Sequence, residues 1–493
     1  MIHKVTLYHN FYKISTMNNL FLNFKMFKLN YLILKDFLMN IKEFLESYKL
    51  IIIALIIGLS LYFSALFYFG ETQSRLVGLI AFLVTLWTNN GLHMGTVSLL
   101  PIILFPIFGV VDANSVVTNY SKTTIFLFIG GFLLAIATEK SGLHKQIASK
   151  LLSIFPKTPR GVLLSLMITS GFLSSILSNT TTALLIITIA SFLTTNKDFK
   201  FRLLLGVAYA SSIGGIITPV GTPPNLILMD FIDSQGLESI PFATWILMML
   251  PLAIIMMVIA SEVLLYGFKK ENFELIELKK DELSLTHNQK KMLYILSALG
   301  VILALNPILK NLFGILINEK LTILAFGLLM FLPKIDLLEW KEDFAKIPFA
   351  IVFLFGAGFS IAMAFNKTGL ATEIADIMMG FSYLSPIVLM IIIGAGVVFA
   401  TELTSNTALT SIMIPIIYPF ATQSGLDPMI FMLIVAISAS YAFMLPIATA
   451  PNAIAMSTGD VDIKEMIKRG FILNIIGIVV TFGVALSYWK LFL

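Results

Sequence analysis

Two copies of the tripeptide Ser-Asn-Thr carry the side chains best suited to ligand chemistry in this 493-residue chain. They are Ser178-Asn179-Thr180 and Ser405-Asn406-Thr407, and each interrupts an apolar segment. Hydroxyl and amide groups are neutral, so they can hydrogen-bond a carboxylate without placing a permanent charge in an apolar environment. If each tripeptide forms the tip of a helical hairpin, helix N-termini that point at the tip add partial positive charge. The alternative is that these residues only join helices to one another.

A second pair of motifs is rich in proline. Thr218–Asn225 reads Thr-Pro-Val-Gly-Thr-Pro-Pro-Asn, and Leu445–Asn452 reads Leu-Pro-Ile-Ala-Thr-Ala-Pro-Asn. Proline removes a backbone donor and breaks the helical hydrogen-bond ladder, so each motif predicts an unwound point within a span. The freed carbonyls are hard oxygen ligands of the kind that bind Na⁺ in transporters with discontinuous helices. A plain proline kink is the alternative.

Other chemistry is poorly represented in the sequence. There is no cysteine, which excludes disulfides and thiolate chemistry. We find no zinc-protease motif, phosphate-binding loop or acidic cluster with metal spacing, so the sequence favours a protein that is not an enzyme. Glu402 is the one acid near either tripeptide. Its two alternative roles are a coupling group in transport and a hydrogen-bonded structural acid.

The elements that position these motifs are membrane-spanning helices. Apolar residues make up 58% of the chain, charged residues 12%, and the mean hydropathy is +0.92. A soluble chain of this length needs more charge than this on its surface. Runs of about 20 apolar residues predict about 11 spans. They lie near 50–70, 75–88, 91–109, 123–139, 201–232, 242–267, 290–308, 320–333, 348–366, 428–457 and 468–491. The segments 161–195 and 384–420, each interrupted by a tripeptide, are predicted re-entrant hairpins.

The distribution of positive charge orients this arrangement. With the N-terminus in the cytoplasm, 27 of the 33 Lys and Arg residues fall on the cytoplasmic side and the C-terminus is external. The net charge of +5 gives no nucleic-acid patch, because the basic residues lie at the ends of apolar runs. Residues 1–48 form a basic extension, and their second half, from Met39, is expected to be an interfacial helix.

An internal repeat at one constant offset supports the same organisation. Residues 128–148 and 355–375 share 10 identities in 21 positions at an offset of 227. The same offset, without a gap, superimposes the two tripeptides and the two proline motifs. Each repeat contains an odd number of crossings, so the second copy is inverted in the membrane. We therefore predict an all-α polytopic membrane protein with two inverted repeats, which is the architecture of secondary transporters.

These motifs in this order resemble the divalent anion/sodium symporters, the di- and tricarboxylate transporters of the ion-transporter superfamily. The resemblance covers residues 49–493. It implies a homodimer in which a scaffold holds a transport domain that moves as an elevator. Scaffold helices would occupy 49–122, 242–347 and 468–493, with transport repeats at 123–241 and 348–467.

Site residues follow from the resemblance by motif. The substrate would contact Ser178, Asn179, Thr180, Thr222, Ser405, Asn406, Thr407 and Thr449. One Na⁺ would use Ser174, Ser178, Asn179 and Gly221, and a second would use Thr401, Ser405, Asn406 and Ala448. The sequence departs from the family at two places. Ala450 stands where some relatives carry a second proline, and Asn89-Asn90-Gly91 stands where a Glu is expected after Trp-Thr.

The resulting expectation is sodium-coupled symport of dicarboxylates of the succinate, malate and fumarate class across the cell membrane. Two alternatives on the same fold are a sodium-independent dicarboxylate exchanger and a sulfate or phosphate transporter. An exchanger needs fixed positive charge to balance a dianion, and no Lys, Arg or His lies in the four motifs. Symport is therefore favoured.

Overall fold

The computed structural model describes residues 46–493 except 90, 270–272, 274, 276–283, 315–316 and 382. The secondary structure of these residues is helical. Five helical segments are long and apolar enough to cross a membrane: Glu46–Ala65, Ala113–Lys140, Phe242–Leu265, Phe349–Thr368 and Ile463–Leu491. The count of about 11 spans stays a prediction, because other apolar helices are shorter or interrupted. The interfacial helix expected from Met39 lies largely outside the described residues.

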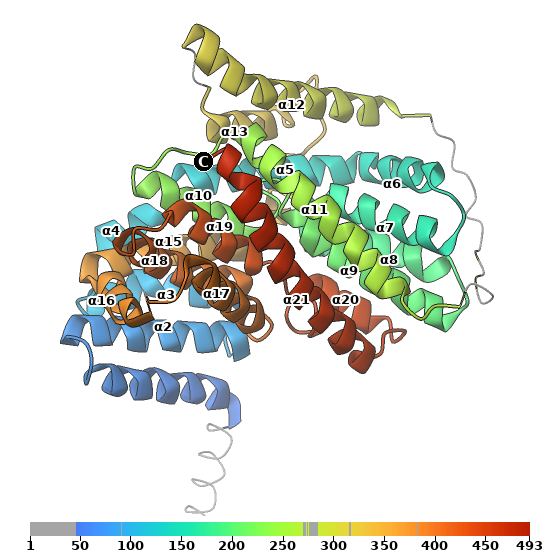
Figure 1. The fold of residues 1–493 in the computed structure, drawn as a ribbon. Helices are drawn as coiled ribbons and strands as arrows, with labels where there is room; N and C mark the ends of the chain where they lie inside the picture. Colours follow the sequence, from blue (N-terminus) through green and yellow to red (C-terminus); the bar gives the residue numbers. More distant parts are fainter. Residues whose placement is uncertain are drawn as a thin grey trace, which may run out of the picture.

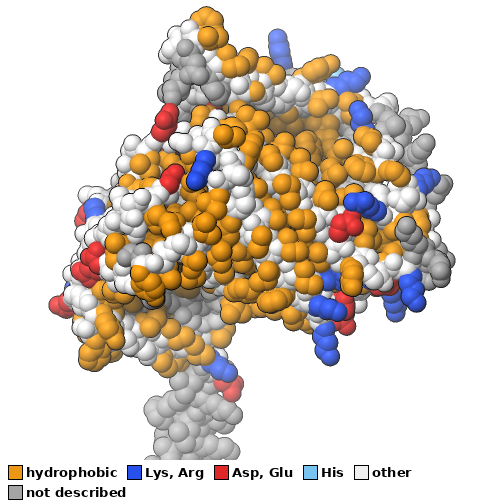
Figure 2. Space-filling view, viewed as in Figure 1, with side chains coloured by type: hydrophobic (Ala, Val, Ile, Leu, Met, Phe, Trp, Pro, Cys, Tyr) orange, Lys and Arg blue, Asp and Glu red, His pale blue; other side chains and the backbone are white. Residues whose placement is uncertain are grey.

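The surface and the helix arrangement agree with a membrane environment. In Figure 2, hydrophobic side chains cover the broad middle of the visible face, and charged side chains lie mostly toward its margins. Many large apolar residues are exposed, such as Ile56, Phe63, Leu247 and Val479. Helix Glu46–Ala65 lies beside α2 (Glu71–Asn89) at one edge of the molecule (Figure 1).

Each Ser-Asn-Thr tripeptide lies at a turn between two helices. The first turn joins α7 (Pro159–Ser174) to α8 (Asn179–Phe192), and the second joins α17 (Pro386–Thr401) to α18 (Asn406–Gln423). Helix α7 begins with Pro159 and α17 with Pro386, where a missing backbone donor costs nothing. These helix pairs match the positions of the two expected hairpins, although their membrane depth remains a prediction.

Each proline motif separates two half-helices. The first break lies between α9 (Lys197–Gly215) and α10 (Pro223–Ser234), and the second between α19 (Pro428–Ser438) and α20 (Ala450–Ser457). Prolines stand in the first turn of both α10 and α20. The second break starts earlier than its proline motif, because α19 ends at Ser438 rather than at Ala442, the equivalent of Gly215.

The other helices surround these hairpins and broken helices. They are α3 (Met94–Ile107), α4 (Ala113–Asn119), α5 (Thr123–Lys140), α6 (Leu143–Ile154), α11 (Phe242–Leu265), α12 (His287–Phe313), α13 (Glu319–Leu329), α14 (Trp340–Asp343), α15 (Phe349–Thr368), α16 (Leu370–Met378) and α21 (Ile463–Ser487). Helix α5 packs most extensively against α13, and α15 against α3. Helices α11 and α21 pack against each other and against the hairpins and broken helices.

The two halves of the chain interlock. Helix α10 packs against α18, and α20 packs against α8, so each broken helix reaches the hairpin of the other half. These two contacts are equivalent under the offset of 227. Ion pairs show the same exchange: Lys140 pairs with Glu339, and their equivalents Lys367 and Asp112 also pair.

Two glycines at equivalent positions bend the chain between a long helix and a short one. Gly142 separates α5 from α6 with φ +73°, and Gly369 separates α15 from α16 with φ +76°. A side chain is disfavoured in this left-handed conformation, so glycine is the residue that allows the bend. Helix α6 then packs on α7, and α16 packs on α18.

Candidate functional site

The predicted substrate residues occupy the N-termini of four helices. Ser178 and Ser405 cap α8 and α18, and their hydroxyls accept hydrogen bonds from the backbone N–H groups of Thr181 and Ala408. Thr222 and Thr449 occupy the same cap position on α10 and α20. Asn179-Thr180 and Asn406-Thr407 are the first two helical residues after the serine caps. Four helix N-termini supply backbone donors and partial positive charge, which suit an anionic ligand.

The first set of predicted cation ligands comes together around Asn179. The Ser174 hydroxyl oxygen lies 2.6 Å from Asn179 Oδ1 and 2.7 Å from the Ser211 carbonyl oxygen, and its single proton can be donated to either acceptor. A Cβ added to Gly215 would lie 2.9 Å from Asn179 Oδ1 and 3.3 Å from the Gly221 carbonyl oxygen. The structure therefore brings Ser174, Asn179 and Gly221 to one place, with Gly215 between them.

The second set repeats this geometry around Asn406. The Thr401 hydroxyl oxygen lies 2.5 Å from Asn406 Oδ1 and 2.9 Å from the Ala439 carbonyl oxygen, and its single proton can be donated to either acceptor. Ala439 is one residue beyond the equivalent of Ser211, since α19 ends early. Among the described residues, no hydrogen bond links Ala448 to Asn406, and none joins one tripeptide to the other.

Two asparagines outside the predicted site hold the breaks in shape. Asn225 Nδ2 donates to the carbonyls of Gly215 and Thr218 at 3.2 and 2.9 Å. Asn452 Nδ2 donates to the equivalent carbonyls, of Ala442 and Leu445, at 2.9 and 3.0 Å. The side-chain oxygens of both asparagines are buried and accept no hydrogen bond from any residue that the structure describes. This role was not predicted from the sequence, and the Pro-Asn ending shared by the two motifs is the signal that could have indicated it.

The hydrogen-bond partners of Glu402 lie outside the two tripeptides. Its carboxylate accepts hydrogen bonds from the backbone N–H groups of Met444 and Leu445 at 2.8 and 2.9 Å. It also accepts one from Asn474 Nδ2 of α21 at 2.7 Å. In the other half, the equivalent position is Ser175, whose carbonyl accepts from the Thr218 hydroxyl. Glu402 thus ties the second break to its hairpin and to α21.

The donor chemistry fits alkali cations and a carboxylate. The clustered groups are neutral hydroxyl, amide and carbonyl oxygens, which are hard ligands. Thr222 and Thr407 are 3% and 5% exposed, so a ligand at these N-termini would be largely removed from water. No group of three or more His, Asp or Glu side chains that could hold a metal occurs in the described part of the chain.

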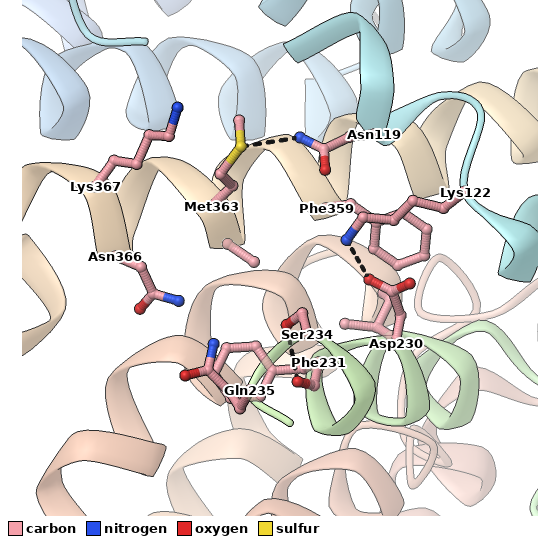
Figure 3. Close-up of a pocket in the computed structure, with 12 residues that line it drawn as sticks. Asn119, Lys122, Asp230, Phe231, Ser234, Gln235, Phe359, Met363, Asn366 and Lys367 are labelled. Carbon is pink, nitrogen blue, oxygen red and sulfur yellow. Dashed lines mark hydrogen bonds and ion pairs between the residues drawn. The ribbon is translucent and has the colours of Figure 1, made fainter. Parts of the chain in front are cut away.

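A separate cavity lies toward the far end of α10. It has a volume of about 280 Å³ and lies between α10, α15 and the start of α5 (Figure 3). Its lining includes Lys122, Asp230, Phe231, Phe359 and Met363 but no residue of the two tripeptides. This cavity was not foreseen from the sequence.

Comparisons with solved structures agree with this fold. The YdaH transporter of Alcanivorax borkumensis superimposes with a TM-score of 0.59 at 12% identity, covering 81% of this chain and 99% of that one. MtrF of Neisseria gonorrhoeae, described as one of a class of antimetabolite efflux pumps, gives a TM-score of 0.57 at 14% identity, covering 82% and 96%. These similarities define the fold of a polytopic membrane transporter.

Sequence similarity identifies the family. The citrate transporter family matches residues 80–436. The sodium-dependent dicarboxylate transporter SdcS of Staphylococcus saprophyticus is 30% identical over 465 residues, which cover 87% of this chain and 89% of the relative. The SdcS of Staphylococcus aureus is 30% identical over 466 residues, with the same coverage. The chain belongs to this family of di- and tricarboxylate transporters, and it is a multi-pass membrane protein rather than an enzyme.

Proposed function

We propose that this protein is a sodium-coupled symporter of dicarboxylates of the succinate, malate and fumarate class. The observation that carries the proposal is the pair of equivalent hydroxyl–asparagine clusters, Ser174 with Asn179 and Thr401 with Asn406, each at a helix N-terminus. Each cluster would hold one Na⁺, and the dianion would lie between the tripeptides. The names of the SdcS relatives support both ligands.

The charge balance of the site favours symport over exchange. The four motifs contain no Lys, Arg or His. The only positive charge that the motifs offer to a dianion is therefore the partial charge of the helix N-termini. Moving a bare dianion into a low-dielectric site is strongly unfavourable. Bound Na⁺ ions would supply the missing charge and attract the carboxylates.

We further propose that transport moves an inner unit against an outer frame. The inner unit would comprise α7–α11 and α17–α21, and the frame would comprise helix Glu46–Ala65, α2–α5 and α12–α15. This division differs from the sequence-based domains: α11 and α21 join the inner unit, and α5 and α15 join the frame. The packing of α11 and α21 on the hairpins, and of α5 on α13, supports the change.

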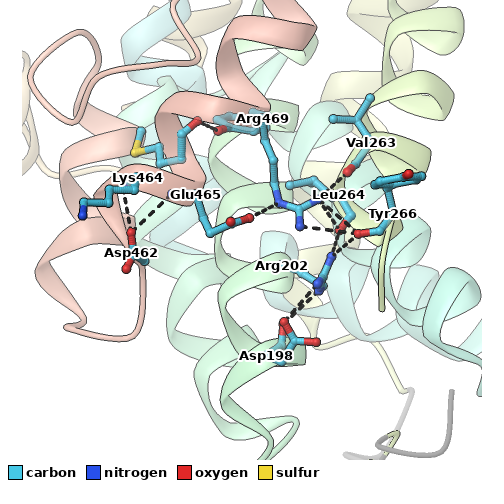
Figure 4. Close-up of polar contacts among 11 residues, drawn as sticks. Asp198, Arg202, Val263, Leu264, Tyr266, Asp462, Lys464, Glu465 and Arg469 are labelled. Atoms are coloured by element: carbon cyan, nitrogen blue, oxygen red, sulfur yellow. Dashed lines mark hydrogen bonds and ion pairs between the residues drawn. The ribbon is translucent and has the colours of Figure 1, made fainter. Parts of the chain in front are cut away.

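Two arginines bind the cytoplasmic end of the inner unit together. Arg202 of α9 and Arg469 of α21 both donate to backbone carbonyls at the end of α11, those of Leu264 and Tyr266 (Figure 4). Their side chains are 5% and 10% exposed, and each also pairs with an acidic residue one helical turn before it. Guanidinium groups so placed satisfy the free carbonyls of a helix end and join three helices into one body.

The decisive experiment is uptake of labelled succinate into proteoliposomes with and without an inward sodium gradient. Symport predicts concentrative uptake with the gradient and little without it. Equal uptake in choline chloride, with acceleration by internal dicarboxylate, would instead indicate the exchanger. Inhibition of uptake by sulfate or phosphate, at concentrations at which unlabelled succinate does not inhibit, would indicate an inorganic anion carrier.

Binding gives an independent test of sodium dependence. Succinate should raise the melting temperature of the purified protein in NaCl and leave it unchanged in choline chloride, since the dianion needs bound cations. Equal stabilisation in both salts would contradict symport. The homodimer that the family resemblance implies is tested on the same sample by the mass of the detergent-solubilised particle.

A further inference from the structure

A polar network crosses the seam between α10 and the outer frame. Asp230 accepts from Lys122 Nζ at 2.7 Å and from the Thr124 hydroxyl at 3.2 Å (Figure 3). One turn further along α10, Asp233 pairs with Lys320 of α13, and Lys320 also donates to Thr124 Oγ1 over 3.0 Å. Thr124 therefore joins the two ion pairs into one network.

The Lys122–Asp230 pair is less exposed to solvent than an ordinary surface ion pair. The Asp230 side chain is 9% exposed, and Thr124 is fully buried. Lys122 Nζ also lies 4.8 Å from the centre of the Phe359 ring, so the frame itself holds the lysine in place. Partial burial reduces screening by water and salt.

Side chains make most of the link between α10 and the α5–α13 side of the frame. Helix α10 packs on α15 of the frame and on α18 and α19 of the inner unit, whereas the side chains of Lys122 and Lys320 link it to α5 and α13. The cavity of about 280 Å³ opens beside the Lys122–Asp230 pair. The α5–α13 side of the seam is therefore held mainly by this polar network.

The equivalent end of α20 has no such network among the described residues. Ser457 stands at the position of Asp230, and its hydroxyl donates to the Ile454 carbonyl of its own helix. Asp460, the equivalent of Asp233, pairs with Lys200 of α9 at 3.5 Å, within the inner unit. Phe349 stands at the position of Lys122. The two halves of the chain therefore differ at this point.

We infer that Lys122, Thr124, Lys320, Asp230 and Asp233 form a one-sided latch that holds the inner unit against the frame in this conformation. The inference rests on the proposed motion of the inner unit. The latch must open in each transport cycle, so its ion pairs bias the conformational equilibrium toward the state described here. Weakening it should increase the population of states in which the seam is open.

The test uses a single cysteine in a chain that has none of its own. Ala362 of α15 lines the cavity and is partly buried, so a cysteine there should react faster with a membrane-impermeant maleimide dye when the seam is open. We expect Ala362→Cys to be labelled about fivefold faster when Asp230→Asn and Asp233→Asn are added, as loss of ion pairs of this kind predicts. The matched control is Asp460→Asn, which removes an ion pair inside the inner unit and should leave the labelling rate unchanged.

A charge exchange separates pairing from simple loss of charge. Lys122→Asp combined with Asp230→Lys should return labelling toward the rate of the parent, whereas either change alone should accelerate it. The inference is overturned if the double Asn variant is labelled at the parental rate, if Asp460→Asn accelerates labelling equally, or if the exchange variant remains fast. Sodium-driven succinate uptake by the unmodified protein is measured separately, so failure of the proposed function is distinguished from failure of the latch.

Discussion

Phe128 of α5 and Phe355 of α15 stack on each other, with ring centroids 3.7 Å apart and planes at 17°. They occupy equivalent positions in the internal repeat, 227 residues apart. A residue contacts its own equivalent only close to a two-fold axis that relates the two copies. This contact supports an arrangement in which the halves are related by two-fold symmetry, as inverted repeats require.

Inverted repeats predict that the bases of the two hairpins face opposite sides of the membrane. A cysteine at the exposed residue Lys197 should react with an impermeant maleimide only from the cytoplasm. Asp427 caps α19 through its side chain, so the nearby exposed residue Gln423 is a safer external position. Labelling of both cysteines from one side would contradict the inverted topology.

Asn179→Asp and Asn406→Asp should each abolish dicarboxylate uptake. Asp keeps the oxygen that accepts from Ser174 or Thr401, but it adds a negative charge beside an anionic substrate. This repulsion should exceed the ~1 kcal/mol of a neutral hydrogen bond. Uptake of labelled succinate measures the loss, and an unchanged elution profile shows that the variants fold. Wild-type uptake by both variants would remove the tripeptides from the site.

Gly221→Ala should weaken sodium activation of uptake. A Cβ on Gly221 would lie 2.4 Å from the Gly215 carbonyl oxygen, so the backbone that lines the first cluster must shift. We expect the sodium concentration for half-maximal uptake to rise by about tenfold, because a misplaced ligand costs on the order of 1.4 kcal/mol. Gly131→Ala is the control, since nothing lies within 4 Å of a Cβ there. An unchanged sodium response would place the cation away from Gly221.

Glu402→Gln should destabilise the second break. Glutamine has nearly the same shape as glutamate, but its NH₂ group is a donor and replaces one of the two oxygens that accept from backbone N–H groups. One of those N–H groups would then lose its acceptor. An unsatisfied buried donor costs about 1–3 kcal/mol, so the melting temperature should fall and uptake with it. Glu262→Gln, at a side chain that is 54% exposed, should have little effect. Full stability of Glu402→Gln would mean that the carboxylate does not hold the break.

Asp343 provides a test outside the spans, in the connection between α13 and α15. Burial raises the pKa of this carboxyl, but hydrogen bonds from Lys140 and Lys346 outweigh that effect and hold the pKa at about 2, below its ordinary value of 3.8. Because the pKa is lower in the folded protein, the ionised carboxyl stabilises the fold at any pH above its ordinary pKa of 3.8. This stabilisation is lost as the pH falls toward 2.

Asp343→Asn should therefore lower the melting temperature equally at about pH 6 and pH 8, by the equivalent of about 2 kcal/mol. The difference from the parent should shrink only under strongly acidic conditions. Asp336→Asn, at an exposed residue of the same connection, should have no effect. A difference that varied between pH 6 and pH 8 would show that another group titrates with Asp343.

The sequence alone determined the features that depend on local chemistry. Prolines place the breaks, because a missing N–H interrupts a helix wherever it occurs. Ser178, Ser405 and Thr449 cap helix N-termini, because their hydroxyls accept hydrogen bonds from free backbone donors. The constant offset of 227 predicted that the two breaks correspond to each other, and Asn225 and Asn452 donate to carbonyls at equivalent positions of the two breaks.

Only the tertiary structure decided which distant groups meet. The carbonyls of Ser211 and Ala439 complete the two clusters at positions that differ by one residue in the repeat, because α19 ends early. Glu402 lies within three residues of a tripeptide, yet it turns toward Asn474 of α21. The partners of Asp230 come from a helix more than 100 residues away. Such contacts depend on how helices pack side by side, and a repeat in the sequence constrains that packing without specifying each partner.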